Sequence, residues 1–253
     1  ARPGRAGLSP SSASGLSAAP AEDPDVSSPA DLPDRLRRHL DHRPELLPRD
    51  ATVLVAFSGG PDSTALLHLL HGLAGERGWR LRAAHYDHGM REGSAEEARR
   101  VAGRAEALGV PCRVGRPDDP LPAKQEALRR ARYAFLRETA EETGADRVAT
   151  GHQADDQAET VLFRILRGTG IRGLGGIPER RGPVVRPLLP FRGEELRAWL
   201  EARDVGWLDD PSNRDPRWAR ARIRTRVMPA LEEAWDGPVR ERLLDLAAEA
   251  RRA

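Results

Sequence analysis

The chain has 253 residues, of which 39% are hydrophobic, enough for one large α/β domain with a small appendage. Its 41 basic and 39 acidic side chains leave a formal net charge of +2, so any nucleic-acid surface must be a local patch. The one cysteine, Cys112, excludes an internal disulfide and a CxxC metal or redox pair, and it fits a reducing cytoplasm. No apolar run approaches the roughly 20 residues of a membrane span, and the N-terminus lacks the layout of a signal peptide.

The first 33 residues are mainly Ser, Ala, Pro and Gly and have no hydrophobic periodicity. Such a segment buries too little apolar surface to offset its ordering entropy, so we predict a disordered tail over residues 1–33, with a docking segment as the alternative. Residues 32–47 carry Leu36 and Leu40 and predict a short amphipathic helix against the sheet edge. We place the main domain at residues 34–190 and a helical extension at residues 191–253.

A mostly apolar run, Thr52–Phe57, predicts a strand buried on both faces. A loop follows it directly and leads into a predicted helix from Thr64; the loop comprises Ser58, Gly59, Gly60, Pro61, Asp62 and Ser63. A glycine-rich turn between a strand and a helix aims backbone N–H groups and the positive helix end at a phosphate. The glycines allow close approach, the serines add donors, and Asp62 offers a carboxylate to Mg²⁺. An ordinary βα turn is the alternative.

Further strands are predicted at Arg80–Tyr86, Val110–Val114, Asp146–Thr150 and Val184–Leu189. Helices are predicted over residues 94–108, 123–143, 154–167, 194–203, 217–235 and 239–252, the first opened by the capping-box pattern Ser94-Ala-Glu-Glu97. The alternation predicts an α/β fold with a doubly wound, parallel, five-stranded sheet and a C-terminal helical appendage. Because ligands bind at the carboxyl ends of such strands, we expect Ser58, Asp87–His88 and Gly151–His152 to share one rim.

Three acids open the predicted helix over residues 154–167. Asp156 and Glu159 are three residues apart and share a face, whereas Asp155 points elsewhere. Acids in a first helical turn commonly complement the helix dipole, which is the structural interpretation. Beside a phosphate-binding loop, the pair is also suited to hold Mg²⁺ through its oxygens or to grip an ammonium group.

The loop lacks both the Gly-Lys-Ser/Thr of a Walker loop and the three-glycine spacing of a dinucleotide fingerprint. SGGPDS instead resembles the SGGxDS loop of the N-type ATP pyrophosphatases, the PP-loop superfamily with an adenine nucleotide alpha hydrolase-like fold. With GHQADDQAET at residues 151–160, the chain resembles the tRNA(Ile)-lysidine synthetase family over about residues 51–229. The other matching positions are Arg164, Arg167–Gly170, Gly173–Leu174, Arg186–Leu189, Asp210–Asn213 and Arg222–Arg224.

Members of that family use ATP to adenylate the C2 carbonyl of the wobble cytidine of tRNA(Ile) with a CAU anticodon. The ε-amine of free L-lysine then displaces AMP and gives lysidine, with pyrophosphate as the other product. The resemblance implies the same ATP- and Mg²⁺-dependent ligase here, which forms a carbon–nitrogen bond in the cytoplasm. It also implies tRNA contact through residues 191–253 and no membrane partner. The oligomeric state stays open, with a homodimer as one option.

The resemblance also implies residue roles. The implied catalytic residues are Asp62, Arg129, Arg132, Asp156, Glu159 and Arg222, and the implied metal ligands are Asp62, Asp156 and Glu159. The implied nucleotide-binding residues are 58–63, His85, Asp87, His88, Gly151 and His152. The family's E-x-x-R-x-x-R-Y helix places Arg129 or Arg132 on phosphate oxygens. Both assignments have a structural alternative. His85 would have its hydrogen bonds satisfied within its strand, and Arg129 and Arg132 would lie on a solvated, charged helix face. A zinc site is excluded because no cysteines accompany the histidines.

Two further segments invite a functional interpretation. Gly168–Gly176 is expected to be a mobile loop that shelters an adenylate, or else a plain linker. The arginines between Arg217 and Arg226 are expected to grip RNA phosphates, or else to be solvated. Ala221 departs from the asparagine usual in the family. Cys112 is expected to be buried filler rather than a catalytic thiol.

Three other functions fit the same loop less well. A tRNA thiolase needs a persulfide cysteine or a cysteine-held cluster, and this chain has one cysteine. An ammonia-using amidotransferase domain is a weaker option, since no glutaminase segment is present. A module that binds ATP or tRNA without turnover is the third, if C-terminal tRNA-binding domains are missing from this chain.

Overall fold

The computed structural model describes residues 31–119, 122, 124–209 and 215–253. The tail up to residue 30, Ala123 and the Asp210–Asn213 motif lie outside the described residues. The first half alternates strands and helices in the order α1 (Leu32–His42), β1 (Thr52–Ala56), α2 (Pro61–Arg77), β2 (Arg80–Tyr86), α3 (Ser94–Ala107), β3 (Cys112–Gly115), α4 (Gln125–Thr143) and β4 (Arg147–Thr150).

The second half is mostly helical. Its elements are α5 (Ala154–Leu166), α6 (Ile171–Leu174), β5 (Arg180–Arg181), β6 (Val184–Val185), α7 (Gly193–Glu201), α8 (Ala219–Arg222), the π-helix η3 (Ile223–Val227), α9 (Met228–Ala234) and α10 (Val239–Arg252). Within the ranges given above, no helix has both the length and the apolar character needed to cross a bilayer.

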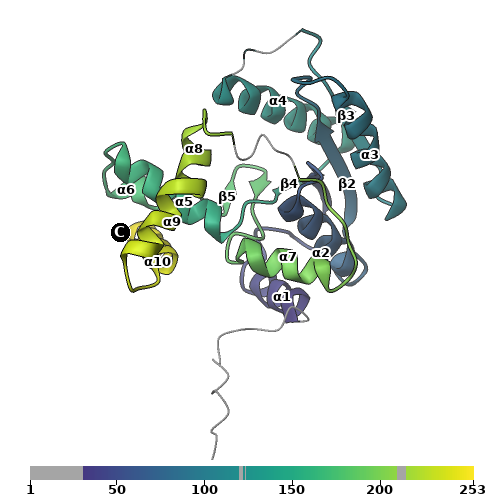
Figure 1. Cartoon of the computed structure of the whole chain (residues 1–253). Helices are drawn as coiled ribbons and strands as arrows, with labels where there is room; N and C mark the ends of the chain where they lie inside the picture. Colours follow the sequence, from purple (N-terminus) through teal and green to yellow (C-terminus); the bar gives the residue numbers. More distant parts are fainter. Residues whose placement is uncertain (1–30, 120–121, 123, 210–214) are drawn as a thin grey trace, which may run out of the picture.

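One sheet of six strands lies at the centre, in the order β3-β2-β1-β4-β6-β5 (Figure 1). Every neighbouring pair is parallel except β5 and β6, which are antiparallel. The α/β, doubly wound class is therefore confirmed, but the predicted count of five strands is wrong. The missed strand, β5, consists of two exposed arginines and carries no apolar pattern. The strand expected over Val184–Leu189 ends at Val185, and a turn follows.

Strand β1 is buried on both faces, as its apolar run predicts. Val53 and Val55 face the main core, which α1, α2, α3 and α7 complete. Leu54 faces a smaller core against Phe135 and Leu136 of α4. The strand order reverses direction at β1, because β2 and β3 lie on one side of it and β4 lies on the other. The carboxyl ends of β1 and β4 therefore form a topological switch point, where ligands bind in such folds.

The C-terminal helices pack in two different places. Helix α7 packs into the main core through Leu196, Trp199 and Leu200. Helices α9 and α10 lie beside α5 (Figure 1). There, Ile223 of η3 and Met228 of α9 pack against Ala158 and Leu162 of α5 in a separate cluster. The domain boundary at residue 190 stays a prediction.

The helix expected over residues 217–235 is not continuous. It begins at Ala219, widens into the π-helix η3 and resumes as α9. Two local features explain the break. Pro229 has no N–H to donate to the preceding turn, and the Thr225 hydroxyl donates to the Ala221 carbonyl oxygen at 2.7 Å. A π turn shifts the direction in which its side chains project, and Arg224 lies on it.

Two other local expectations are corrected. Ser94 does not form a capping box: the N-cap of α3 is Gly93, and the Ser94 hydroxyl donates to Asp87 Oδ2 at 3.0 Å. The glycine-rich stretch from residue 168 contains the short helix α6 rather than a loop throughout. Arg164 Nη1 donates to the Gly173 and Gly176 carbonyl oxygens, and Arg251 Nη1 donates to that of Gly175.

The end of β4 packs directly on the first turn of α2. A Cβ atom added to Gly151 would lie 3.0 Å from the Asp62 carbonyl carbon and 3.0 Å from the Ser63 backbone nitrogen. These are backbone atoms of a helix and cannot rotate away. A glycine at 151 therefore allows the chain after β4 to pack against the first turn of α2.

Gly151→Ala is expected to lower the free energy of unfolding by about 1–3 kcal/mol, because the added methyl overpacks this contact. Gly72→Ala in α2 is the matched control: a Cβ there meets nothing within 4 Å, and it should stabilise by about 0.5–1 kcal/mol. Urea denaturation of both variants measures the difference. A Gly151→Ala variant as stable as wild type would contradict the proposed close packing.

Candidate active site

The loop over residues 58–63 is held open toward the sheet edge by its own hydroxyl groups. The hydroxyl oxygens of Ser58 and Ser63 lie 3.0 Å apart, and the Ser58 N–H donates to Ser63 Oγ at 3.2 Å. Gly59 has φ +83, a left-handed conformation that favours glycine. Gly60 is the N-cap of α2 and has no side chain to cap the first N–H groups, so the positive end of this helix faces the loop, with Asp62 in its first turn.

Asp62 projects from the first turn of α2 into a poorly solvated position. Its Oδ1 atom is buried and has no hydrogen-bond partner in the described part of the chain. Burial, followed by the negative charge of Asp156, raises the pKa of Asp62 to about 7. The two carboxylates are therefore electrostatically coupled across the β1–β4 junction, which brings the loop and the acids of α5 to one site.

Asp156 and Glu159 share one face of α5 and hold a single cation, the guanidinium of Arg224. Arg224 Nε donates to Glu159 Oε1 at 2.6 Å, and its Nη2 donates to Asp156 Oδ1 at 2.9 Å and to Glu159 Oε2 at 3.0 Å. Glu159 is almost fully buried, with its side chain 2% exposed. Burial raises the pKa of Glu159 despite the opposing effect of Arg224.

Arg222, which is predicted to be catalytic, does not contact the acids of α5 in this structure, and its catalytic role stays a prediction. Arg222 is exposed and donates to the carbonyl oxygens of Pro216 at 2.9 Å and Arg217 at 3.1 Å, away from the acids. Arg224 takes the position at the acids instead. The sequence offered a signal, since Arg224 closes the Arg222-Ile-Arg224 motif, but it offered no indication of the π turn that orients it.

Asp155 points away from this pair, as expected. Its Oδ2 accepts from the Gly193 N–H at 2.9 Å, and its Oδ1 accepts from Arg240 Nη1 at 3.0 Å. Asp155 thus ties the start of α5 to α7 and α10. Asp156 also closes a capping box, because its Oδ2 accepts from the Gln153 N–H at 3.2 Å.

The predicted nucleotide-binding histidines line the same edge on both sides of β1. His85 Nδ1 lies 2.9 Å from the Phe57 carbonyl oxygen, so the backbone directly after β1 satisfies one ring nitrogen. The His88 ring packs edge-on against Tyr86, with centroids 5.0 Å apart. Asp87 accepts from the Gly89 N–H at 2.8 Å and from Ser94, so it shapes the turn before α3.

His152 follows β4 and faces the opposite side, toward α4. Its Nδ1 lies 2.9 Å from Thr150 Oγ1. Burial, and then the positive charges of neighbouring arginines, lower the pKa of His152 well below its ordinary value, so the ring is neutral near pH 7. Among these arginines are Arg129 and Arg132 of α4, whose guanidinium carbons lie 4.6 and 5.6 Å from the Tyr133 ring centroid.

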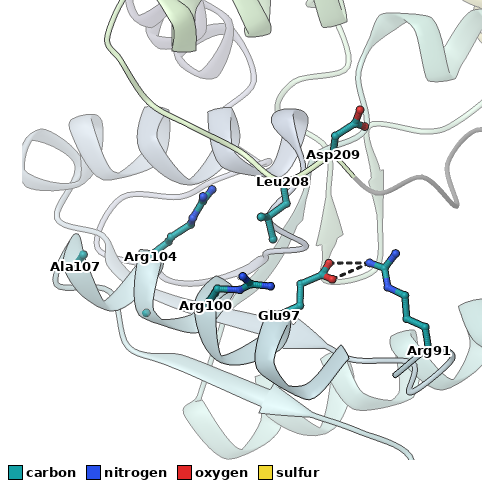
Figure 2. Close-up of a pocket in the computed structure, with 8 residues that line it drawn as sticks. Arg91, Glu97, Arg100, Arg104, Ala107, Leu208 and Asp209 are labelled. Atoms are coloured by element: carbon teal, nitrogen blue, oxygen red, sulfur yellow. Dashed lines mark hydrogen bonds and ion pairs between the residues drawn. The ribbon is translucent and has the colours of Figure 1, made fainter. Parts of the chain in front are cut away.

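A groove of about 560 Å³ runs along α3 beneath the segment that carries Leu208 (Figure 2). The Leu208 N–H donates to the Gly59 carbonyl oxygen at 2.8 Å, so this segment covers the outer side of the loop. Arg104 Nη1 donates to the Gly206 carbonyl oxygen at 3.0 Å, and Arg91 forms an ion pair with Glu97. The segment that carries Leu208 thus supports the loop from outside. No residue of α5 lines the groove.

The acidic residues suit a magnesium ion only with help from other ligands. No group of three acidic, histidine or cysteine side chains gathers at metal-binding spacing among the residues described. Both Glu159 oxygens are already bound by Arg224. Asp62 has an unpartnered buried oxygen of the kind that Mg²⁺ prefers, so it fits the ion if phosphate oxygens or waters complete the shell.

The model of the PP-loop domain matches residues 34–231 of this chain. The chain belongs to the PP-loop domain family. The resemblance drawn from SGGPDS is thereby confirmed, and the family model covers the loop, the acids of α5 and Arg224 in one match.

Curated relatives of this PP-loop domain include several tRNA(Ile)-lysidine synthases. The chain is 42% identical over 200 residues to a tRNA(Ile)-lysidine synthase of Chlorobaculum tepidum and 45% identical over 212 residues to one of Thermus thermophilus. These matches cover 76% and 81% of this chain, but 60% and 40% of the relatives. The chain therefore spans about half the length of these proteins.

A solved structure supports the fold. The U34-tRNA thiolase NcsA from Methanococcus maripaludis, solved with its [4Fe-4S] cluster, matches with a TM-score of 0.70. The match covers 88% of this chain and 77% of that protein at 17% identity, so the likeness concerns the fold alone.

Cys112 of this PP-loop domain is partly buried at the edge strand β3, and burial raises the pKa of its thiol to about 12. The thiol stays protonated near pH 7 and is a poor nucleophile.

The raised pKa of Asp62 predicts a pH-dependent stability. Its folded-state pKa is about 7, whereas an unfolded aspartate titrates at roughly 3.9. Between these values the folded protein binds the proton more tightly, so the metal-free protein loses stability as the pH rises from about 4 to about 7. Near pH 4 the free energies of unfolding of Asp62→Asn and wild type should be equal. Near pH 7.5 that of Asp62→Asn should be higher than that of wild type by about 1–4 kcal/mol.

The measurement for Asp62→Asn is urea denaturation in EDTA across that pH range. Asp41→Asn serves as control, since Asp41 lies on α1 beside Arg77, remote from the loop. A difference between Asp62→Asn and wild type that is the same at pH 4 and pH 7.5 would show that Asp62 is not perturbed.

Removing Arg224 should uncover a buried charge. Arg224→Gln leaves Glu159 without its ionic partner and should lower the free energy of unfolding by about 2–4 kcal/mol. Arg222→Gln, two residues away on the same segment, should change it by no more than about 0.5 kcal/mol. The double variant Glu159→Gln/Arg224→Gln should recover part of the loss. Equal effects of the two arginine variants would refute the assignment of Arg224 to the acids.

Proposed function

We propose that this PP-loop domain catalyses the tRNA(Ile)-lysidine synthetase reaction. In this reaction the C2 carbonyl oxygen of the wobble cytidine attacks the α-phosphate of ATP, and pyrophosphate leaves. The ε-amine of L-lysine then displaces AMP and forms the carbon–nitrogen bond of lysidine. The substrates are ATP, tRNA(Ile) with a CAU anticodon and free L-lysine, and the setting is the cytoplasm, which the single cysteine suits.

The observation that carries the proposal is one juxtaposition. A phosphate-binding loop and a carboxylate pair that already holds a cationic group meet at the β1–β4 junction. A phosphate site beside a cation site is what a reaction between a nucleotide and an amine requires. The names of the relatives at 42% and 45% identity support the same reaction.

The loop is suited to hold the pyrophosphate portion of ATP. The N-terminus of α2 and the hydroxyl groups of Ser58 and Ser63 offer donors to phosphate oxygens. Asp62 would hold Mg²⁺, which would neutralise charge on the departing pyrophosphate. Arg129 and Arg132, near His152, offer guanidinium groups to phosphate oxygens.

The carboxylate pair is suited to bind lysine. Asp156 and Glu159 bind the Arg224 guanidinium through three hydrogen bonds, which shows that these oxygens accept a cationic group, and a lysine ammonium group would bind them by displacing Arg224. The amine must lose a proton before it attacks. Glu159 is buried and its pKa is raised, which suits it to accept that proton.

The test uses ATP, a tRNA(Ile) transcript with a CAU anticodon and labelled lysine. Wild type should place label in the tRNA, with AMP release that depends on both lysine and tRNA. Asp156→Asn should reduce label transfer about 100-fold or more, because the amine loses its positioning group. Asp155→Asn is the matched control, as the adjacent acid faces Gly193 and Arg240 instead.

Two results would count against the proposal. AMP release without label in the tRNA would reject lysine as the nucleophile. Binding of ATP and tRNA without AMP release would favour a binding module without turnover. Circular dichroism of both aspartate variants separates a loss of function from a loss of structure.

A further inference from the structure

Four arginines from three separate segments surround His152 on the side of the site that faces α4. Arg129 and Arg132 come from α4, Arg186 follows β6, and Arg220 lies on α8. Arg129 and Arg132 lie over the Tyr133 ring, with guanidinium carbons 4.6 and 5.6 Å from its centroid, and Arg186 hydrogen-bonds the Tyr133 side chain. The positive charge of each of the four acts on the His152 ring. Residues up to 91 positions apart in the chain, from Arg129 to Arg220, are thus brought to one place by the fold.

The four arginines have only neutral partners among the residues that the structure describes. Arg129 donates to the Tyr133 hydroxyl at 3.3 Å, and Arg132 lies over the Tyr133 ring. Arg186 Nη1 donates to the Pro178 carbonyl oxygen at 2.7 Å, and Arg220 Nη2 donates to Thr160 Oγ1 at 2.5 Å.

Other arginines of the site are neutralised. Arg224 binds Asp156 and Glu159, and Arg240 binds Asp155 and Glu232. The four arginines around His152 therefore leave a concentration of positive charge without a carboxylate, at the rim where the proposed substrates bind. His152 adds no negative charge, because the ring is neutral.

Arg186 is the most unusual member. It is 4% exposed, and its Nε atom is buried without a hydrogen-bond partner. Burial of a guanidinium that has no anionic partner is costly, and an unsatisfied donor adds to that cost. The Pro178 carbonyl oxygen and the Tyr133 side chain are neutral hydrogen-bond partners and compensate only part of this cost. A bound anion would compensate the rest.

We propose that Arg129, Arg132, Arg186 and Arg220 form a phosphate-binding pocket, distinct from the loop over residues 58–63, in which Arg186 is the buried member that positions the group. A planar guanidinium donates two parallel hydrogen bonds to phosphate oxygens, which explains why arginines are used here. The inference rests on the proposed function for its two sources of phosphate: the pyrophosphate released from ATP and the RNA backbone beside the reacting cytidine.

The test compares Arg186→Gln with a matched buried arginine outside the pocket. Arg77→Gln is that control, because Arg77 is 6% exposed but pairs with Asp41 at 2.8 Å. Two probes are titrated separately in the absence of lysine: inorganic pyrophosphate, and a synthetic RNA stem–loop whose loop contains CAU. Binding of the RNA is repeated at several salt concentrations.

Arg186→Gln should weaken binding of at least one probe about 10-fold or more, since a charge-assisted contact is lost. Loss on the pyrophosphate arm identifies the product of ATP cleavage as the ligand. Loss on the RNA arm, with the dependence of log affinity on log salt reduced by about 1, identifies an RNA phosphate. Arg186→Lys should restore part of the affinity, and Arg77→Gln should bind both probes as wild type does.

If Arg186→Gln does not fold, Arg220→Gln carries the same comparison, because Arg220 is only half-buried. Folded variants that bind both probes within twofold of wild type would overturn the pocket and leave Arg186 as a brace for the segment around Pro178. Because lysine is absent, this outcome is independent of the lysine-transfer assay. The proposed function can therefore fail without affecting this result, and the pocket can fail without affecting the proposed function.

Discussion

The site depends on the close approach of two parallel strand ends. Strand β4 pairs with β1, and Gly151, directly after β4, packs against the backbone of Asp62 and Ser63. A side chain at residue 151 would crowd the backbone of the first turn of α2. The absence of one Cβ thus lets a phosphate loop and a carboxylate pair share a site, and the order of the strands places that site at the switch point of the sheet.

Charge is separated across this junction. On the α5 side, Asp156 and Glu159 share the guanidinium of Arg224, the charge of Asp156 acts on Asp62, and burial raises the pKa of Asp62 and Glu159. On the α4 side, four arginines surround a neutral His152. Opposite charges on the two sides of a poorly solvated edge suit it to bind an amine at the carboxylates and phosphates at the arginines, close to one another.

The helical layer after α7 contributes a charged residue to the centre of the site. Its apolar contact with α5 centres on Ile223 and Met228 against Ala158 and Leu162, with Val239, Leu243 and Leu244 of α10 packed around them. Beside that contact, Arg224 binds the acids and Arg220 binds Thr160. The position of this layer therefore controls both the acid cluster and the arginine pocket, which couples the C-terminal helices to the chemistry of the loop.

The sequence by itself determined the elements whose signals are local. The apolar run of β1, the glycines of the loop and the alternation of strands and helices led to the correct fold class, because backbone sterics and burial act over a few residues. Spacing also placed Asp156 and Glu159 on one face. The two exposed arginines of β5 and the π turn at Ile223–Val227 carried no such signal. Only the tertiary structure could choose Arg224 over Arg222, or gather Arg186 and Arg220 beside His152. Those contacts join residues 34 to 68 positions apart, and they depend on how helices pack rather than on any pattern along the chain.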